Sequence, residues 1–401
     1  AQRYAQLEHL TNRLTKGVRL GIDRMNLTTN AVHDRFPNWP EVLADDPSQS
    51  QGVDFLPLGW LCVDQKLQSA LKAEPADGSS GGNGSTDNQK LPALFTKSQL
   101  PSRLPVVLHR RLYSAVVIRC SSAHMNQAIE MSQQILWRLL SGAPPARAKL
   151  TLIDPLGRGQ NFTEFMALAD HDPTIVGHRV WTTDSKIDSR LSELAHHVED
   201  ILQASLRDRF ERIEDYNEVA GSMAEPYRAV AAIGFPEALS RSSYGHLNAL
   251  IESGLRCGVS TILVCDKAKR WPSDMPAPSG DKVLELELSD RGDWRLLSGD
   301  LQEVPFTPAA GPTEAIRVEL VNKIGTAAVN ASRVEIPLHN VLSAAEEGKK
   351  SSDDGLSIVI GSQGAIRSLH LELGEGVRQH VLIAGKTGSG KSTLLHSIIS
   401  S

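Results

Sequence analysis

The residue pattern with the most definite chemistry lies near the end of the chain, where Gly385 to Ser392 read GKTGSGKS. It matches the pattern G-x-x-x-x-G-K-[ST] of a phosphate-binding loop, in which glycines let the backbone wrap a phosphate without Cβ clashes. Lys391 would reach the β and γ phosphates of ATP, and Ser392 would bind Mg²⁺. The predicted ATP-binding residues are Gly385, Lys386, Thr387, Gly388, Ser389, Gly390, Lys391, Ser392 and Thr393.

The flanking residues decide between a phosphate clamp and a structural glycine-rich turn, because the bare pattern arises by chance in about one chain in a hundred of this length. HVLIA at 380–384 predicts a short buried strand, and STLLHSII at 392–399 predicts a helix that opens on the motif. Amides at the start of such a helix point at a bound anion. ATP and Mg²⁺ are therefore the predicted cofactors of the intact protein.

Hydrolysis needs more than this loop. It requires a downstream strand that ends in an acidic residue for the metal, and a second carboxylate that positions water. The sequence stops at Ser401, within an apparent helix, and begins at Ala1. We interpret it as part of a longer polypeptide, expect the catalytic carboxylates beyond Ser401, and expect no ATP hydrolysis by this segment alone.

An α/β domain is predicted upstream of the motif, because short β-branched runs alternate with longer helical stretches from Pro105 onward. Near-continuous apolar strands separated by helices are typical of a parallel sheet that is covered on both faces. The predicted strands are 115–119, 149–153, 176–182, 228–235 and 260–265, and the predicted helices are 125–140, 186–213 and 243–256.

The remaining segments suggest a modular chain. Residues 1–35 predict an amphipathic helix, either a single packing helix or the end of an upstream coiled coil. Residues 36–104 read as an irregular connector with a strand at 59–63 and a flexible loop at 78–88, GSSGGNGSTDN. After the α/β domain at 105–270, residues 271–354 predict a linker with β elements, and 355–401 predict the start of a second α/β domain.

Composition excludes several classes of protein. The 401 residues are 40% hydrophobic and 22% charged with a formal charge of -5, so no global electrostatic footprint for nucleic acid exists and only a local patch such as Arg110 and Arg111 remains. The four cysteines are too far apart for a CxxC metal pair, which suits a reducing cytoplasm. No apolar run approaches the roughly 20 residues of a membrane span. Membrane attachment of the parent protein is left open.

The run QHVLIAGKTGSGKSTLLHSII at 379–399 resembles the entry to the motor domain of FtsK/SpoIIIE-type DNA translocases, in the FtsK–HerA branch of P-loop ATPases. LTLIDPLGRGQNF at 150–162, RIEDYNEVAG at 212–221 and GLRCGVSTILVCD at 254–266 resemble, in the same order, landmarks of a complete motor of that family. The resemblance implies a RecA-like P-loop NTPase fold, tandem motor domains, a homo-oligomeric (hexameric) ring and double-stranded DNA as partner.

The first motor copy, 105–270, departs from the family pattern where the chemistry lies. Aligned with the intact loop, it places Cys120, Met125, Asn126 and Gln127 at the positions of Gly385, Gly390, Lys391 and Ser392. Gly234 and Phe235 stand where the resemblance implies an acid pair. We interpret this copy as degenerate, with an unrelated α/β domain as the alternative.

Other candidate residues have ordinary alternatives. Asp154 is either a site residue at a strand's carboxyl end or a turn-capping carboxylate. Arg256 is a candidate arginine finger by resemblance, with a surface ion pair as the alternative. Glu214 and Asp215 read as a solvated helix end. The paired His196 and His197, like Cys120, are interpreted as packing and surface residues.

The leading hypothesis is the regulatory half of an ATP-driven, ring-forming translocase. Its first motor is catalytically dead and holds partner proteins, and its second motor binds ATP. DNA is the cargo by resemblance alone, so a type VII secretion-like protein-export ATPase stays open. An ABC-type ATPase is a further alternative, because LHLELGEGVRQHVLIAGKTGSGKSTLL at 369–395 also resembles the opening of transporter nucleotide domains. The last alternative is a purely structural, partner-binding module.

Overall fold

The structure is a computed structural model, and it describes residues 38–45, 55–62, 103–207, 209–237, 239–297, 305–331, 355–363, 367–374, 380–386 and 388–400. The chain divides into two compact units. Unit 1 is Ala1–Val198 with Tyr227–Val329, and unit 2 is Glu199–Pro226 with Asn330–Ser401. The expected helix at 1–35 and the loop at 78–88 lie outside the described residues.

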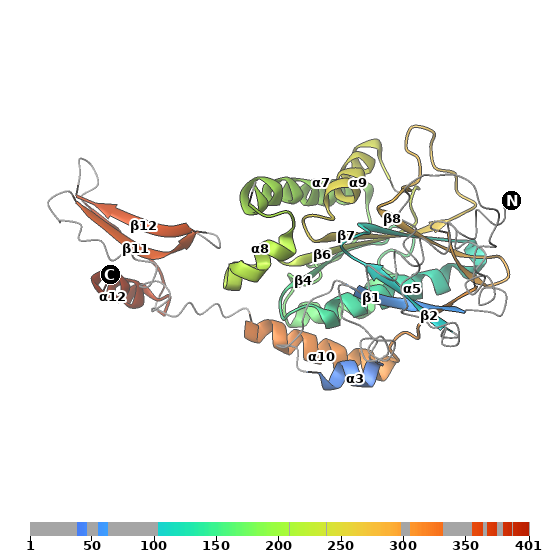
Figure 1. Ribbon diagram of the computed structural model, residues 1–401, viewed down its shortest axis with the longest axis horizontal. Helices are drawn as coiled ribbons and strands as arrows, with labels where there is room; N and C mark the ends of the chain where they lie inside the picture. The colour runs from blue at the N-terminus through green and yellow to red at the C-terminus, as the bar shows by residue number, and fades with distance from the viewer. Residues whose placement is uncertain are drawn as a thin grey trace, which may run out of the picture. The chain divides into compact units, whose positions relative to one another are not determined.

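Unit 1 is built on one large sheet (Figure 1) whose described strands stand in the order β2-β1-β10-β9-β8-β3-β7-β6-β4-β5. Strands β8, β3, β7, β6, β4 and β5 run parallel, and the others pair antiparallel. The α/β class predicted from the sequence, with a largely parallel sheet, is confirmed. The strands are β1 (Phe55–Cys62), β2 (Arg103–His109), β3 (Ala115–Cys120), β4 (Ala148–Ile153), β5 (Val180–Trp181), β6 (Tyr227–Ile233), β7 (Val259–Asp266), β8 (Val283–Leu288), β9 (Trp294–Leu296) and β10 (Pro305–Pro308).

The central strands are apolar because both faces of the sheet are covered. Strands β3 and β7 are buried along almost their whole length. Helix α5 (Met125–Gly142) packs on β3 and β7 from one face, while α9 (Arg241–Ser253) packs on β7 and lies with α7 (Asp184–Asp200) on the other (Figure 1). Buried parallel strands covered by helices are the arrangement that the sequence pattern predicts.

Two predicted elements are shorter than expected. The predicted strand 176–182 is reduced to Val180–Trp181, with turns before it. The predicted helix 186–213 ends as α7 at Asp200, continues as a π-helical turn at Ile201–Leu206, and breaks at Arg207, where φ is 43°. A new helix, α8, spans Ile213–Ala220. A non-glycine residue with positive φ ends helical geometry.

The segment 271–354, expected to be a linker with β elements, contains strands and a helix among its described residues. Strands β8, β9 and β10 extend the sheet, and α10 (Glu314–Ala331) is a helix with Leu320 and Ala328 fully buried. Gly325 of α10 packs closely on His171, since a Cβ built on Gly325 would lie 2.3 Å from the ring Cγ. Residues 332–354 lie outside the described part.

The first described helix, α3 (Trp39–Ala44), is tied to α10 and its preceding loop. Asn38 caps α3 through a reciprocal capping box with Glu41. The Trp39 indole donates to the Ala310 carbonyl at 2.8 Å, and Lys323 of α10 donates to the Val42 carbonyl at 2.7 Å. Strand β1 pairs with β10 at Trp60↔Thr307, so segments about 250 residues apart in sequence lie side by side.

Unit 2 contains the antiparallel pair β11 (Leu356–Gln363) and β12 (Arg367–Leu373), together with α12 (Lys391–Ser400). The prediction of a buried strand at 380–384 is wrong: these residues form no strand, and Leu382 is 91% exposed. A parallel strand needs a neighbour to satisfy its backbone. Within the described residues of unit 2, β11 and β12 pair only with each other.

No described helix is both long enough and apolar enough to span a bilayer.

Candidate functional site

The glycine-rich loop of unit 2 has the backbone shape of an anion cradle. Gly388 and Gly390 have φ of 80° and 85°, values that favour glycine, and α12 begins directly afterwards at Lys391. No heavy atom would lie within 4 Å of a Cβ at Gly388 or Gly390. Thr387 lies outside the described residues. The loop therefore leaves open space at the start of a helix, where backbone amides attract anions.

The lysine of the motif folds back on its own loop. The Lys391 Nζ donates to the carbonyl of Gly385 at 2.8 Å and to that of Lys386 at 2.6 Å. A bound phosphate would compete for this ammonium group, because a lysine–phosphate contact is charge-assisted and a carbonyl contact is weaker. Ser392 and Thr393 lie exposed in the first turn of α12.

The corresponding loop of unit 1 has a different backbone. Strand β3 ends at Cys120, Ser122–His124 form a 3-10 turn, and α5 begins at Met125 with φ of -56°. None of the residues from 120 to 127, all of which the structure describes, has a positive φ. This loop therefore lacks the left-handed turns that let Gly388 and Gly390 curve the backbone around an anion.

The sheet of unit 1 nevertheless has the strand order at which α/β proteins bind ligands, and we call the position outside the carboxyl ends of β3 and β7 the crevice. Helix α5 leads from β3 towards β4 on one side, whereas the chain returns from β7 to β8 on the other. Ligands bind at such a switch point, outside the carboxyl ends of the strands. Here the crevice is bridged, because the Ser122 hydroxyl donates to Asp266 Oδ2 at 2.5 Å and the Lys267 amide donates to the Cys120 carbonyl at 2.8 Å.

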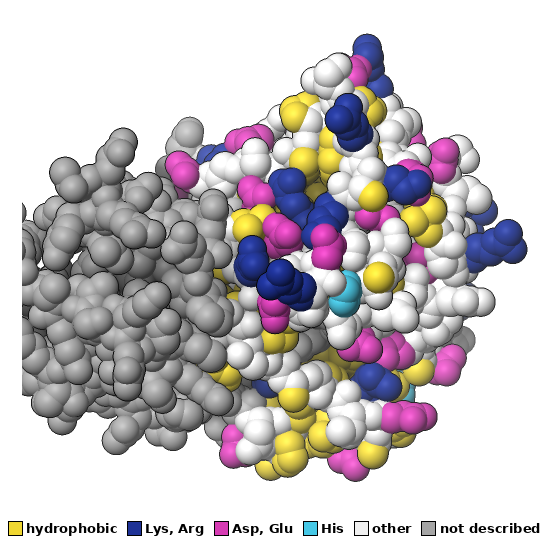
Figure 2. All heavy atoms as spheres, turned by 90° about the vertical axis from the view of Figure 1, so that its right-hand side faces the viewer, with side chains coloured by type: hydrophobic (Ala, Val, Ile, Leu, Met, Phe, Trp, Pro, Cys, Tyr) yellow, Lys and Arg dark blue, Asp and Glu magenta, His cyan; other side chains and the backbone are white. Residues whose placement is uncertain are grey.

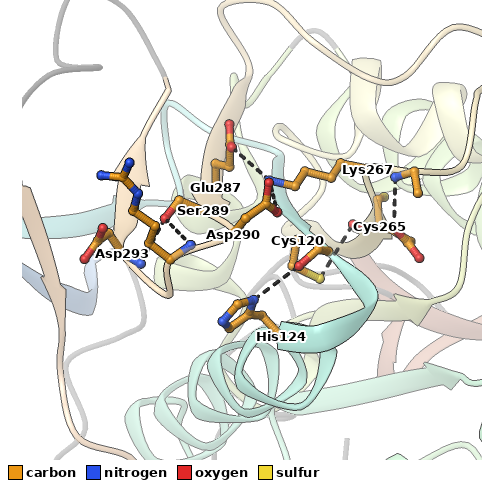
Figure 3. A network of polar contacts seen from close by, with 12 residues as sticks. Cys120, His124, Cys265, Lys267, Glu287, Ser289, Asp290 and Asp293 are labelled. Carbon is orange, nitrogen blue, oxygen red and sulfur yellow. Dashed lines mark hydrogen bonds and ion pairs between the residues drawn. The ribbon is translucent and has the colours of Figure 1, made fainter.

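A turn between β8 and β9, Ser289–Asp293, adds to this bridge (Figure 3). The Lys267 Nζ lies 2.9 Å from Asp290 Oδ1 and 3.4 Å from Glu287 Oε1. The hydrogen bond from Lys267 lowers the pKa of Asp290, and the same contact raises the pKa of Lys267. The hydrogen bond from Ser122 lowers the pKa of Asp266. Both carboxylates are therefore held in their charged form.

The strand where the resemblance implies an acid pair ends without one. Strand β6 is followed by Gly234, with φ of 87°, and by the buried Phe235. A side chain at Gly234 would be strained by this positive φ, and its Cβ would displace the Leu156 side chain, whose Cδ1 lies 2.6 Å away. The next acid, Glu237, is exposed and pairs with Lys269 at 2.6 Å.

Asp154 organises the loop after β4. It is fully buried, and its carboxylate accepts from the amides of Gly157, Gly159 and Asn161 and from Asn161 Nδ2 at 2.9 to 3.1 Å. With these oxygens occupied, the geometry favours the turn-capping interpretation of Asp154 over a role as a site residue.

Two sequence interpretations are corrected by burial. Arg110, offered as part of a phosphate-binding patch, is 3% exposed; it donates to Ser260 Oγ and to the Gly258 carbonyl. A buried guanidinium cannot reach DNA.

Glu214, expected on a solvated helix end, is also buried, with Oε2 3.4 Å from Arg212 Nε. A buried carboxylate is stable when it is paired in this way.

The remaining candidates are one arginine, two cysteines and a histidine of unit 1. Arg256 is exposed in the turn that leads into β7, at the amino end of the strand. Burial raises the pKa of Cys120 to about 11 and that of Cys265 to about 12, so both behave as packing residues. His196 is exposed, and its ring lies against the Ser192 carbonyl. Among the described residues, no group of three His, Cys, Asp or Glu side chains could hold a metal ion.

Sequence reasoning missed the residues that close the crevice, namely Ser121, Ser122, Asp266, Lys267 and Asp290. A signal was present, since Asp266 and Lys267 directly follow the predicted strand 260–265. Asp290 lies in SDRGD at 289–293, a polar turn between two apolar runs. What the sequence does not reveal is that this turn stands next to β3.

No family model and no curated protein matches the chain. Among solved structures, it is similar to EssC (ATPases 2 and 3) from Geobacillus thermodenitrificans, with 12% identity, 88% of this chain and 65% of that one covered, and a TM-score of 0.48. It is also similar to Thermomonospora curvata EccC (ATPases 2 and 3) in complex with a signal sequence peptide, with 14% identity, 82% and 57% covered, and a TM-score of 0.45.

A third similar structure is the pCW3 conjugation coupling protein TcpA, monomer form with ATPγS, with 13% identity, 67% and 66% covered, and a TM-score of 0.40. The chain spans less than two thirds of each of these three structures.

Proposed function

We propose that the chain is part of an ATP-driven, ring-forming translocase of the FtsK/SpoIIIE type that acts on double-stranded DNA. The observation that carries the proposal is the contrast between two loop–helix segments of one chain. Gly388 and Gly390 of unit 2 curve around open space, whereas the aligned loop of unit 1 is a 3-10 turn bridged by Ser122. One copy is suited to nucleotide and the other is not.

In this proposal residues Gly385 to Thr393 bind ATP, with Lys391 on the β and γ phosphates and Ser392 on Mg²⁺. Unit 1 is the catalytically dead, regulatory copy that holds partner proteins. Six copies of the parent protein form a ring in the cytoplasm, and Arg256 is the candidate arginine finger towards a neighbouring copy. The catalytic carboxylates come from sequence beyond Ser401.

The test is ATP turnover by the full-length parent protein, with and without linear duplex DNA, beside the Lys391→Ala variant. Lys186→Ala is the matched control, because it removes the same charge from an exposed helical position outside the phosphate loop. DNA-stimulated turnover that is lost in Lys391→Ala and kept in Lys186→Ala is the expected result. Turnover that survives the loss of Lys391 would overturn the assignment of the phosphate clamp.

The burial of Arg110 favours a second candidate, a protein-export ATPase. The formal charge of the chain is -5, and of the two arginines expected to supply phosphate contacts, Arg110 is buried and Arg111 is only partly exposed. One face of the molecule (Figure 2) shows Lys and Arg side chains intermixed with Asp and Glu, without a patch of a single sign. Turnover that depends on Lys391 but is indifferent to duplex DNA would support protein cargo.

A further inference from the structure

We propose that the carboxylates of Asp266 and Asp290 in unit 1 occupy the position that a nucleotide's phosphates would take. In that position they close the crevice at the end of β3. The β8–β9 turn, Ser289–Asp293, holds Asp290 in this position, and we call this turn the latch. The nucleotide site that it covers has lost its phosphate-binding residues. This inference rests on the proposed interpretation of unit 1 as a degenerate motor.

The position of the two carboxylates is the first support. Both lie at the carboxyl ends of strands that flank β3, Asp266 at the end of β7 and Asp290 just after β8. Residues 120–127 of unit 1 align with the phosphate loop at 385–392. The carboxylates thus contact the loop that would hold the phosphates in a working copy.

The groups around the carboxylates are the second support. Hydroxyl groups, an ammonium group and a helix start surround them, and proteins bind phosphate with groups of these kinds. Ser122 Oγ donates to Asp266, and Asp290 takes hydrogen bonds from the Lys267 ammonium and the Ser121 hydroxyl. The imidazole of His124 lies beside Ser121, at 3.2 Å from its Oγ. Helix α5 starts here, at Met125, with no side-chain cap, and a helix start favours negative charge.

The latch is held in shape by its own hydrogen bonds. Ser289 Oγ accepts from the amide of Asp293 at 3.1 Å and from that of Arg291 at 3.3 Å. Gly292, with φ of 84°, lets the turn approach His124, whose Nε2 would lie 3.6 Å from a Cβ at that position. A turn fixed in this way presents Asp290 to the loop without help from a ligand.

The consequence is that unit 1 keeps one arrangement whether or not the other copy holds nucleotide. Removing both carboxylates would leave Lys267, His124, two serine hydroxyls and the start of α5 around a vacated position. These groups together form a cationic site that inorganic phosphate fits. If the two carboxylates take the place of phosphate, their removal should make the thermal stability of the chain increase with added phosphate.

The experiment uses the full chain with Lys391→Ala throughout, so that the loop of unit 2 contributes no phosphate binding. Thermal unfolding is followed in sodium phosphate and in sodium chloride of equal ionic strength, for the Lys391→Ala chain and for the same chain with Asp266→Ala and Asp290→Ala. The expected result is no phosphate-specific shift in the first chain and a rise of about 2–4 °C in the second, at phosphate well above its Kd.

Asp274→Ala is the matched control, since Asp274 is an acid that pairs with Arg241 away from the crevice; it should gain no phosphate response. If the double variant does not fold, Asp290→Ala alone serves, because Asp290 is largely exposed. An equal phosphate response in the chain that keeps both carboxylates would overturn the proposal, and so would the absence of a response in the variants. Neither outcome bears on whether Lys391 is needed for ATP turnover.

Discussion

The Ser122 hydroxyl and the Asp266 carboxylate meet at 2.5 Å across the carboxyl ends of β3 and β7, the two strands that flank the switch point of the sheet. Ser122 comes from a loop and Asp266 from the last position of a strand, and 144 residues separate them in sequence. Their contact bridges the crevice of unit 1. Because it also lowers the pKa of Asp266, the contact can be tested by titration.

Replacing Ser122 by alanine should raise the pKa of Asp266 towards its usual value of 3.8, because the serine hydrogen bond is the largest cause of its lowered pKa. A carboxyl group with a lowered pKa in the folded state stabilises the protein above its unfolded pKa. That contribution is lost as the pH falls below 3.8 through the lowered value. The measurement is a carboxyl-carbon NMR titration of Asp266.

Ser121→Ala is the control for this titration, since the Ser121 hydroxyl contacts His124 and Asp290 and not Asp266. Its Asp266 should titrate as in the unaltered protein. Identical Asp266 titrations in Ser122→Ala and in the unaltered protein would show that the hydroxyl does not hold the carboxylate.

Gly325→Ala should destabilise unit 1, although alanine is normally favoured over glycine inside a helix by about 1 kcal/mol. The added Cβ would meet the His171 ring at 2.3 Å, and such overpacking costs about 1–3 kcal/mol. The measurement is the midpoint of chemical denaturation. Gly311→Ala, where no heavy atom lies within 4 Å, should leave the midpoint almost unchanged.

His171→Ala in the Gly325→Ala background makes the test specific. Shortening the side chain that the new Cβ meets should recover part of the lost stability, because it removes the ring contacts at 2.3 and 2.4 Å and leaves only the contact with the Cβ of residue 171 at 2.8 Å. If Gly325→Ala alone raised the midpoint, the close approach of α10 to His171 would be refuted.

Asp154→Ala should destabilise unit 1 by about 3 kcal/mol or more, because it leaves buried donors without an acceptor. Asp154→Asn should cost less, since its amide oxygen still accepts. As a turn-capping carboxylate, Asp154 should affect the denaturation midpoint and leave ATP turnover per folded parent molecule unchanged. A turnover defect in a fully folded Asp154→Asn protein would restore the site-residue interpretation.

Gly390→Ala should weaken ATP binding by the parent protein, because φ of 85° costs a residue with a Cβ about 1–2 kcal/mol. The expected loss of affinity is about 5- to 30-fold by titration calorimetry. Gly361→Ala, at a glycine of β11 with open space around it, is the control. Equal affinities for Gly390→Ala and Gly361→Ala would argue against a backbone role for the loop.

Strands β3, β6 and β7 were predictable from the sequence because their apolar runs are long and are bounded by turn residues. Strand β9, with three residues, and β10, which begins and ends with proline, carry too little pattern to stand out. They are fixed by pairing: Phe306 of β10 stands opposite Trp294 of β9. Such pairing is a tertiary effect that a single sequence does not display.

The candidate site divides in the same way. The loop around Lys391 was predictable, because its spacing is set by local backbone chemistry. The contact of Asp290 with Lys267 was not, since it depends on β8 lying beside β3. The prediction of a strand at 380–384 was wrong for a related reason. An apolar sequence such as HVLIA forms a buried strand only where neighbouring strands pair with it.

The contact between α3 and α10 joins the first described helix of unit 1 to its last one. Lys323 donates to the carbonyl of Val42 near the end of α3, the Trp39 indole donates to the carbonyl of Ala310 before α10, and β1 pairs with β10. Each of the two segments therefore satisfies hydrogen bonds of the other, so that local opening of either one also loosens its partner.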